Sequence, residues 1–269
     1  HLGKLSTLLE MVRKASRAGV WGVKIQSFFA DELSPKWKEK HDYYKERELS
    51  WDDHGAFVLE CHKNNVVPIT SVCNIAHLTR LKDLGFEYLK IGSAESWHED
   101  LIRLAVMQKF KVFVSTGGRD LDYIADVRGI YAFFHCVSQY PARLDQANLF
   151  RMWEIKNKFK SKTTKENHYG FSDHTNSYHP QWNLPSFVAS AMGASFIEKH
   201  FTTIEREKIK DGKVSIEYEQ LNKLCEFDRL DQKTKMEFLD NVPLSLFLNL
   251  ESKKNEREII DEYEKRWKR

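Results

Sequence analysis

Apolar and polar positions along the chain form two alternating patterns. Short runs rich in β-branched and aromatic residues predict strands at residues 21–27, 66–71, 87–92, 111–115, 131–137, 168–172 and 194–199. Stretches with helical periodicity lie between them, at residues 75–84, 101–108, 149–159 and 181–192. Gly85 and Gly193 directly follow helical patterns, where a left-handed C-cap favours glycine.

Strands that alternate with helices predict a parallel sheet, either an open doubly wound sheet or a closed barrel. Polar side chains capable of chemistry stand near the C-terminal end of nearly every predicted strand. They are Lys24, Gln26, Ser71, Lys90, Ser93, Ser115, Ser138, Ser172, His174 and His200. An open sheet concentrates such residues at one switch point, whereas a barrel brings all strand ends to one site. We therefore expect an α/β fold of the (β/α)8 TIM-barrel type over residues 1–230.

We make a separate prediction for each end of the chain. A barrel of this type has about eight strands, and the pattern gives about seven. The chain opens on a loop that leads straight into an amphipathic helix, so we expect the first barrel strand to precede His1. Residues 231–269 are expected to form a charged helical tail, in which Ile259, Ile260, Tyr263 and Trp267 recur at helical spacing. The alternative for this segment is a solvated or disordered tail.

Composition narrows the class of protein. The formal net charge is +3 over 269 residues, so the clustered basic face that nucleic-acid binding needs is not indicated. No apolar run approaches the length of about 20 residues that spans a membrane. The four cysteines, Cys61, Cys73, Cys136 and Cys225, have no CxxC spacing, and we expect reduced thiols and a cytoplasmic location.

Two histidines are candidate metal ligands. His174 and His200 each follow the end of a predicted strand, and the two strands are successive. A barrel would place the two imidazoles side by side, facing one cavity, as an open divalent-metal site requires. The alternative is a pair of hydrogen-bonded histidines at the barrel rim.

Serines and lysines at the other strand ends indicate an anion pocket. Ser93, Ser115 and Ser172 follow strands, where barrels often hold phosphate with hydroxyl and backbone N–H donors. Lys24 and Lys90 are flanked by apolar residues, so each is expected to point inward, where its charge needs an anionic partner. That partner is either a small phosphorylated carboxylate or an internal carboxylate such as Glu95 or Glu198. A lysine of this kind also forms Schiff bases, which is the mechanistic alternative.

The chain resembles the sialic acid synthase family, which includes legionaminic and pseudaminic acid synthases and spore-coat polysaccharide relatives. The resemblance runs over about residues 2–221. Its motifs are an opening H-x-G at residues 1–3, VKIQSF at 23–28, KIGSAE at 90–95, VSTGG at 114–118, HCVSQYPA at 135–142, YGFSDHT at 169–175, GASFIEKHFT at 193–202 and a weaker DGKVS at 211–215. Each motif is short, but their order and spacing together are specific.

The resemblance implies a polysaccharide-biosynthesis transferase that condenses phosphoenolpyruvate with an N-acetylmannosamine-type amino-sugar aldehyde. It implies a divalent metal on His174 and His200, usually Mn²⁺, with Mg²⁺ or Co²⁺ as alternatives, and a homodimer. The implied phosphoenolpyruvate site consists of Lys24, Ser71, Lys90, Ser93, Ser115 and Ser172. Gln26, Tyr140 and Asp211 would contact the sugar. Glu95, with Lys24, Lys90 and Gln26, would serve the reaction centre by stabilising charge or managing a proton.

Four departures from the family pattern leave other functions open. The glutamate of the family's first strand would precede His1, TSVCN stands where the family has a Ser-Thr-Pro-Phe-like element, and Asp211-Gly212-Lys213 lacks the histidine of a D-H-K element. The segment after Leu230 does not resemble the antifreeze-like domain that reads the N-acetyl group in typical members. One alternative is therefore a synthase for a different aldose. Another is an inert barrel that serves as a binding or scaffold subunit.

Overall fold

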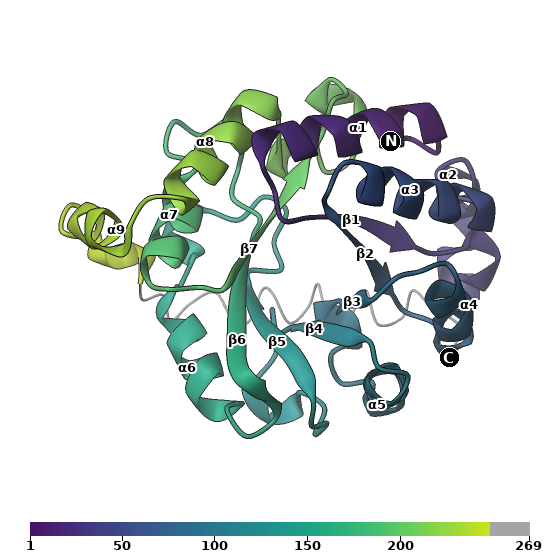
Figure 1. Cartoon of the computed structure of the whole chain (residues 1–269), viewed down its shortest axis with the longest axis horizontal. Helices are drawn as coiled ribbons and strands as arrows, with labels where there is room; N and C mark the ends of the chain where they lie inside the picture. The colour runs from purple at the N-terminus through teal and green to yellow at the C-terminus, as the bar shows by residue number, and fades with distance from the viewer. Residues whose placement is uncertain (248–269) are drawn as a thin grey trace.

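A parallel sheet forms the centre of the molecule. The structure is a computed structural model that describes residues 1–247, including every side chain except those at positions 35, 36 and 38. Its strands follow one another in chain order. They are β1 Gly22–Ser27, β2 Val67–Val72, β3 Tyr88–Ile91, β4 Lys111–Ser115, β5 Ile130–Cys136, β6 Thr163–Asp173, β7 Phe196–Phe201 and the two-residue β8 Ser215–Ile216. The sheet is curled, with its strands arranged around a common centre (Figure 1).

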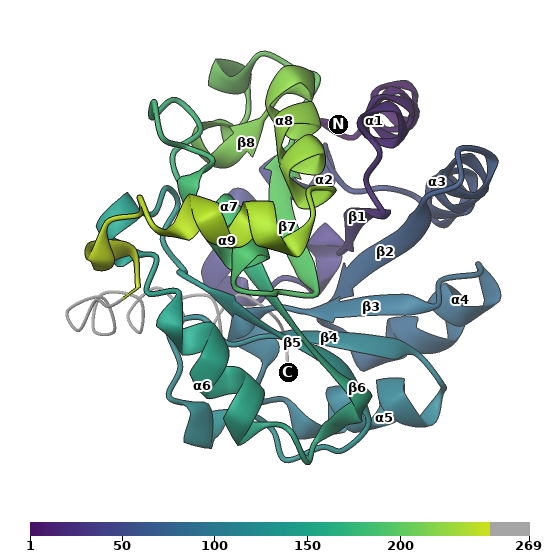
Figure 2. The ribbon, with the colours of Figure 1, turned by 60° about the vertical axis from the view of Figure 1, so that its left-hand side comes forward.

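Helices surround the outside of the curled sheet (Figures 1 and 2). They are α1 Leu5–Ala18, α2 His41–Lys45, α3 Trp51–Lys63, α4 Leu78–Asp83, α5 Glu99–Met107, α6 Phe150–Lys158, α7 Leu184–Ala191, α8 Tyr218–Asp228 and α9 Gln232–Leu239. The apolar side of each helix lies on the sheet or on a neighbouring helix. In α1, for example, Leu8, Val12 and Ala15 are buried at helical spacing, and Gly19 ends the helix with a left-handed φ of 86°.

The expected α/β alternation is confirmed. The strands and helices predicted between residues 21 and 199 are all present, and Gly85 and Gly193 have positive φ values of 92° and 84°. Strand β6 begins at Thr163, earlier than predicted, because its first residues are polar and partly solvent-exposed and so carry no apolar signal. The two-residue β8 was not predicted, since so short a pairing has no periodicity to detect.

The strands of the sheet differ in how deeply they are buried. Every residue of β3 is buried, whereas all six residues of β7 are only partly buried. Among the residues that the structure describes, the strand order runs from β1 at one edge to β8 at the other, with no ladder between β1 and β7. Trp21, directly before β1, and Phe196 of β7 nevertheless meet at 5.2 Å between ring centroids, so the curl brings the beginnings of β1 and β7 together.

The two ends of the sheet interior have opposite character. At the N-terminal ends of the strands an aromatic layer fills the centre, with Trp21, Tyr88, Phe113, Phe134 and Phe196 in mutual contact. Polar side chains occupy the C-terminal ends. The aromatic layer excludes water from below, so charged groups directly above it lie in a medium of low dielectric constant.

Residues after 230 begin with α9, which packs against α7 (Figure 2). Phe238 and Leu246 join the apolar cluster beneath it. The predicted helix around Ile259 and Trp267 lies outside the described residues. In the part of the chain that the structure describes, no helix has the length and apolar character of a membrane span.

Candidate active site

One cavity lies at the C-terminal ends of the strands and has a volume of about 370 Å³. Every residue that the sequence nominated for the site lines it. They are Lys24, Gln26, Ser71, Lys90, Ser93, Glu95, Ser115, Tyr140, Ser172, His174, His200 and Asp211. They come from strands β1 to β4, β6 and β7 and from the loops that follow β3, β5, β6 and β7, which is the convergence expected of a curled parallel sheet.

A buried carboxylate joins the two lysines. Glu198 on β7 places Oε1 2.8 Å from Lys24 Nζ and Oε2 2.5 Å from Lys90 Nζ. The internal ion pair that the sequence left open is therefore present, and Glu198 is the partner. Two ammonium groups share one carboxylate, so the cluster keeps one net positive charge at the bottom of the cavity.

Burial and the ion pairs act in opposite directions on these groups. Burial would raise the pKa of Glu198, but Lys24 and Lys90 outweigh it and hold the pKa well below its usual value. Burial lowers the pKa of Lys90, and Glu198 opposes that effect. The ammonium of Lys90 also lies 3.5 Å from the centroid of the Phe134 ring, where the ring face stabilises a cation.

The two histidines lie side by side in the lining of the cavity, at the ends of the adjacent strands β6 and β7. Their ring centroids are 5.6 Å apart, and Tyr140 stacks on His174 at 4.1 Å. His174 donates its Nδ1–H to the Val137 carbonyl at 2.6 Å, which leaves Nε2 as an acceptor 3.0 Å from the Tyr140 hydroxyl. Burial, with a smaller effect of His200, lowers the pKa of His174 to about 3. Burial and then Lys24 lower the pKa of His200 to about 4, so both rings are neutral at pH 7.

The histidine pair fits the requirements of a divalent-metal ligand set in part. The carbonyl of Val137 fixes the tautomer of His174 that carries its lone pair on Nε2, as a partner in the outer shell of a metal site does. Asp211 Oδ2 lies 4.0 Å from His200 Nδ1. Within residues 1–247, no group of three or more His, Cys, Asp or Glu side chains is arranged to hold a metal. Two imidazoles would therefore need oxygen ligands from substrate or water.

Serines and glycines shape the wall between the lysines and the histidines. Ser93 Oγ accepts a hydrogen bond from the Gly117 N–H at 3.0 Å and lies 3.2 Å from Cys136 Sγ. A Cβ at Gly117 would lie 2.3 Å from Ser138 Oγ, so only glycine fits beside these hydroxyls. Glu95 lies nearby, with Oε2 2.6 Å from where a Cβ of Gly92 would stand.

The sequence did not nominate some residues that line the cavity. Tyr43 and Arg47 come from α2 and the turn after it, and Lys210 comes from the loop after β7. Cys136 also lines the cavity, although the sequence analysis predicted for it only a reduced thiol. Tyr43, Arg47 and Lys210 do not directly follow a predicted strand, so the sequence pattern gives no reason to place them at the cavity. Their segments reach the cavity only in the folded chain.

Comparison with known proteins identifies the family. Residues 11–235 match the model of the NeuB family. The chain is 27% identical to N,N'-diacetyllegionaminic acid synthase of Campylobacter jejuni, over 87% of this chain and 74% of that protein. It is 28% identical to the enzyme of the same name from Legionella pneumophila, over 84% of this chain and 68% of that protein.

The fold agrees with this assignment. A crystal structure of N-acetylneuraminic acid synthetase from Leptospira borgpetersenii superposes with a TM-score of 0.75 at 25% identity, covering 97% of this chain and 88% of that one. The sequence resemblance stated above is confirmed. The chain belongs to the NeuB family and is an enzyme of the condensing-transferase class to which the named synthases of that family belong.

Proposed function

We propose that this enzyme condenses phosphoenolpyruvate with the aldehyde of an open-chain amino sugar, giving a nonulosonic acid and inorganic phosphate. The observation that carries the proposal is the single cavity in which two lysines share one carboxylate beside buried Ser115 and Ser172. A cationic site lined by hydroxyl donors suits a small phosphorylated carboxylate. The named synthases among the relatives make products of this class.

Each group has a role in this proposal. Lys24 and Lys90 bind the charges of phosphoenolpyruvate, with hydroxyl contacts to its phosphate from Ser71, Ser93, Ser115 and Ser172. Gln26, Tyr140 and Asp211 orient the sugar. As C3 of phosphoenolpyruvate attacks the aldehyde carbon, positive charge develops at C2, and the carboxylate of Glu95 is the group that stabilises it or accepts a proton. Water then adds at C2, and phosphate leaves as the keto acid forms.

We propose His174 and His200 as ligands of a divalent cation, with Mn²⁺ as the first choice. Such an ion, when bound, supplies a Lewis acid that polarises the aldehyde oxygen. The hydrogen bond from His174 to Val137 leaves the lone pair of the ring on Nε2, and a bound ion would replace the contact of that atom with the Tyr140 hydroxyl. The neutral state of both rings at pH 7 suits the same role.

Three further parts of the proposal concern the protein as a whole. We propose that the curled sheet is a (β/α)8-type barrel with a place for one more strand between β1 and the part of β7 before His200, which β8 does not pair with. We propose a homodimer in which the residues after 247 help to join the subunits. Four free cysteines suit a reducing compartment, and we propose the cytoplasm.

The test is an assay of phosphate release from phosphoenolpyruvate with Mn²⁺ and N-acetylmannosamine or its 2,4-diacetamido relatives, with mass detection of the ulosonic acid. Lys90→Met keeps the volume and removes the charge. It should weaken phosphoenolpyruvate binding by at least about tenfold, or about 1.4 kcal/mol.

Three results would count against the proposal. A smaller loss of affinity would assign the lysine to the ion pair alone, and a borohydride-trapped adduct would indicate Schiff-base chemistry. Phosphoenolpyruvate binding without turnover of any aldose would favour an inert barrel.

A further inference from the structure

A second cavity lies outside the candidate active site. The residues that line it are Phe29, Glu32, Trp51, Ala76, His77 and Arg80. They come from the loop after β1, from the first residue of α3, and from the segment that runs from the end of β2 into α4. None of them lines the cavity at the strand ends, so the two cavities are distinct.

Three rings form a wall of this second cavity. The ring centroids of Phe29 and Trp51 are 5.0 Å apart, and the His77 ring lies 5.1 Å from Phe29 and 5.3 Å from Trp51. His77 is buried at 6% exposure, whereas Phe29 and Trp51 are partly exposed. The face of an aromatic ring attracts a cation that lies within about 6 Å of its centre. The exposed parts of Phe29 and Trp51 therefore suit a ligand that combines apolar carbon with positive charge.

Two hydrogen-bond acceptors beside this wall are unused. Glu32 Oε1 accepts a hydrogen bond from His77 Nε2–H at 2.6 Å, so the neutral imidazole carries its lone pair on Nδ1. Within residues 1–247, Glu32 Oε2 and His77 Nδ1 are both buried and have no hydrogen-bond partner. A buried polar atom without a partner costs free energy, which a ligand that donates a hydrogen bond to it would recover.

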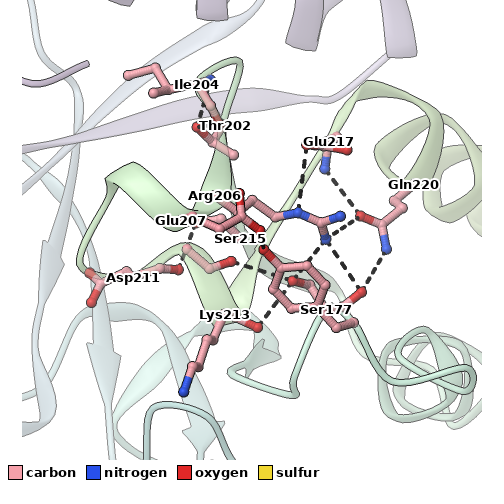
Figure 3. A network of polar contacts seen from close by, with 12 residues as sticks. Ser177, Thr202, Ile204, Arg206, Glu207, Asp211, Lys213, Ser215, Glu217 and Gln220 are labelled. Atoms are coloured by element: carbon pink, nitrogen blue, oxygen red, sulfur yellow. Dashed lines mark hydrogen bonds and ion pairs between the residues drawn. The ribbon is translucent and has the colours of Figure 1, made fainter.

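A polar network in the loops after β6 and β7 gives a contrasting case (Figure 3). Arg206 donates from Nη1 to Ser177 Oγ at 3.1 Å and to Gln220 Oε1 at 3.3 Å, and its Nε lies 3.5 Å from Glu217 Oε1. In the described part of the chain, no side chain of this network has a buried polar atom without a partner. The Arg206 network therefore serves the fold, whereas the pair of Glu32 and His77 retains acceptors for a ligand.

The charges around the second cavity favour a cation. Glu32 contributes a carboxylate, and Asp52 and Asp53 follow Trp51 in the first turn of α3. The opposing charge is that of Arg80, which is exposed, so solvent screens its repulsion of a cation. A hydroxyl group also donates hydrogen bonds to a carboxylate, but only a cation offsets its negative charge.

We propose that the second cavity is a binding site for the primary ammonium group of a small amine. The ammonium group donates a charge-assisted hydrogen bond to Glu32 Oε2, which leaves His77 Nδ1 for a second donor of the same molecule. The rings of Phe29 and Trp51 contact the carbon chain of the amine. The site is independent of the reaction at the strand ends, because the two cavities share no lining residue.

The test is an NMR titration of the indole N–H signals of the seven tryptophans with n-butylammonium chloride at constant ionic strength. The variant Trp51→Phe identifies the Trp51 signal. We expect this signal to shift to a plateau, and we expect 1-butanol, which has a hydroxyl in place of the ammonium, to bind at least about fivefold more weakly.

A pair of variants locates the charge that matters. Glu32→Gln should weaken butylammonium binding by at least about fivefold, or about 1 kcal/mol. The matched control is Asp52→Asn, which removes the same charge beside Trp51 from an exposed position outside the lining of the cavity. The control should change the affinity by less than about twofold.

Three results would overturn the inference. The first is a Trp51 signal that does not reach a plateau, and the second is equal affinity for butylammonium and butanol, which would indicate an apolar pocket only. The third is an equal loss of affinity in Glu32→Gln and Asp52→Asn, which would reveal a general effect of net charge. The comparison of the two ligands uses the wild-type protein, so it decides the matter even if Glu32→Gln does not fold. The titration needs neither phosphoenolpyruvate nor a metal, so a failure of the proposed function leaves its result unchanged.

Discussion

Replacing Glu198 by glutamine tests the centre of the site most directly. The change keeps the side-chain volume but removes the carboxylate that lies 2.8 Å from Lys24 Nζ and 2.5 Å from Lys90 Nζ. Two ammonium groups would then face each other above the aromatic layer with no counter-charge. We expect the folded state to lose stability because Lys90, at 4% exposure, cannot be solvated without opening the cavity.

The magnitude follows from the burial of the three groups. Removing one partner of a buried ion pair typically costs about 3–5 kcal/mol. Here the side chains of Glu198 and Lys24 are 21% and 25% exposed, so solvent screens part of the effect and the lower end applies. A loss of about 3 kcal/mol corresponds to a decrease in Tm of about 6–12 °C for a domain of this size.

The assay is urea unfolding monitored by tryptophan fluorescence, with and without phosphoenolpyruvate. Asp211→Asn is the control, because this carboxylate also lines the cavity but is 41% exposed, and we expect its loss to cost less than about 0.5 kcal/mol. Phosphoenolpyruvate should stabilise the Glu198→Gln variant more than it stabilises the wild-type protein, since the ligand restores negative charge beside the lysines. A stability loss no larger than that of the control, or an equal effect of the ligand on both proteins, would refute the reasoning.

Two further predictions concern histidines. Calorimetric titration with Mn²⁺ should show the loss of a site in the His174→Ala, His200→Ala double variant, and unchanged affinity would contradict the metal assignment. Burial lowers the pKa of His135 to about 3, from about 6.5 in the unfolded chain. Because only the unfolded state takes up this proton between these values, stability is fully present above about pH 6.5 and falls with decreasing pH toward 3, by about 1.4 kcal/mol per unit for one group. His135→Gln, which keeps a donor for the Ala147 carbonyl, should reduce the dependence of unfolding free energy on pH by about one proton, and an unchanged slope would contradict this account.

The sequence alone determined the order and type of the elements and the chemistry at the strand ends. Periods of two and of about 3.6 residues are local properties, as is the positive φ that Gly85 adopts. The position of a residue just after a strand can also be recognised from the local sequence. In a curled parallel sheet the residues at these positions converge on one end. For this reason the sequence predicts that Lys24, Ser115 and His174 share one site, and all three line the same cavity.

Tertiary structure alone decided which groups pair. Lys90 and Glu198 are 108 residues apart, and their ion pair depends on the curl that brings β7 opposite β3. The sequence offered Glu95 and Glu198 equally as partners, because charge complementarity carries no information on distance. The tautomer of His174 likewise depends on a carbonyl 37 residues away.

The residues at the mouth of the cavity were the hardest to predict from the sequence. Arg47 and Lys210 lie in loops whose local patterns resemble any solvated segment, and only the folding of both loops near the strand ends brings them into the lining of the cavity. The hydrophobic periodicity of a strand or helix follows from the backbone conformation that consecutive residues repeat, so a short stretch of sequence reveals it. Pairing across the fold depends on the relative placement of distant elements, which packing of the whole core decides.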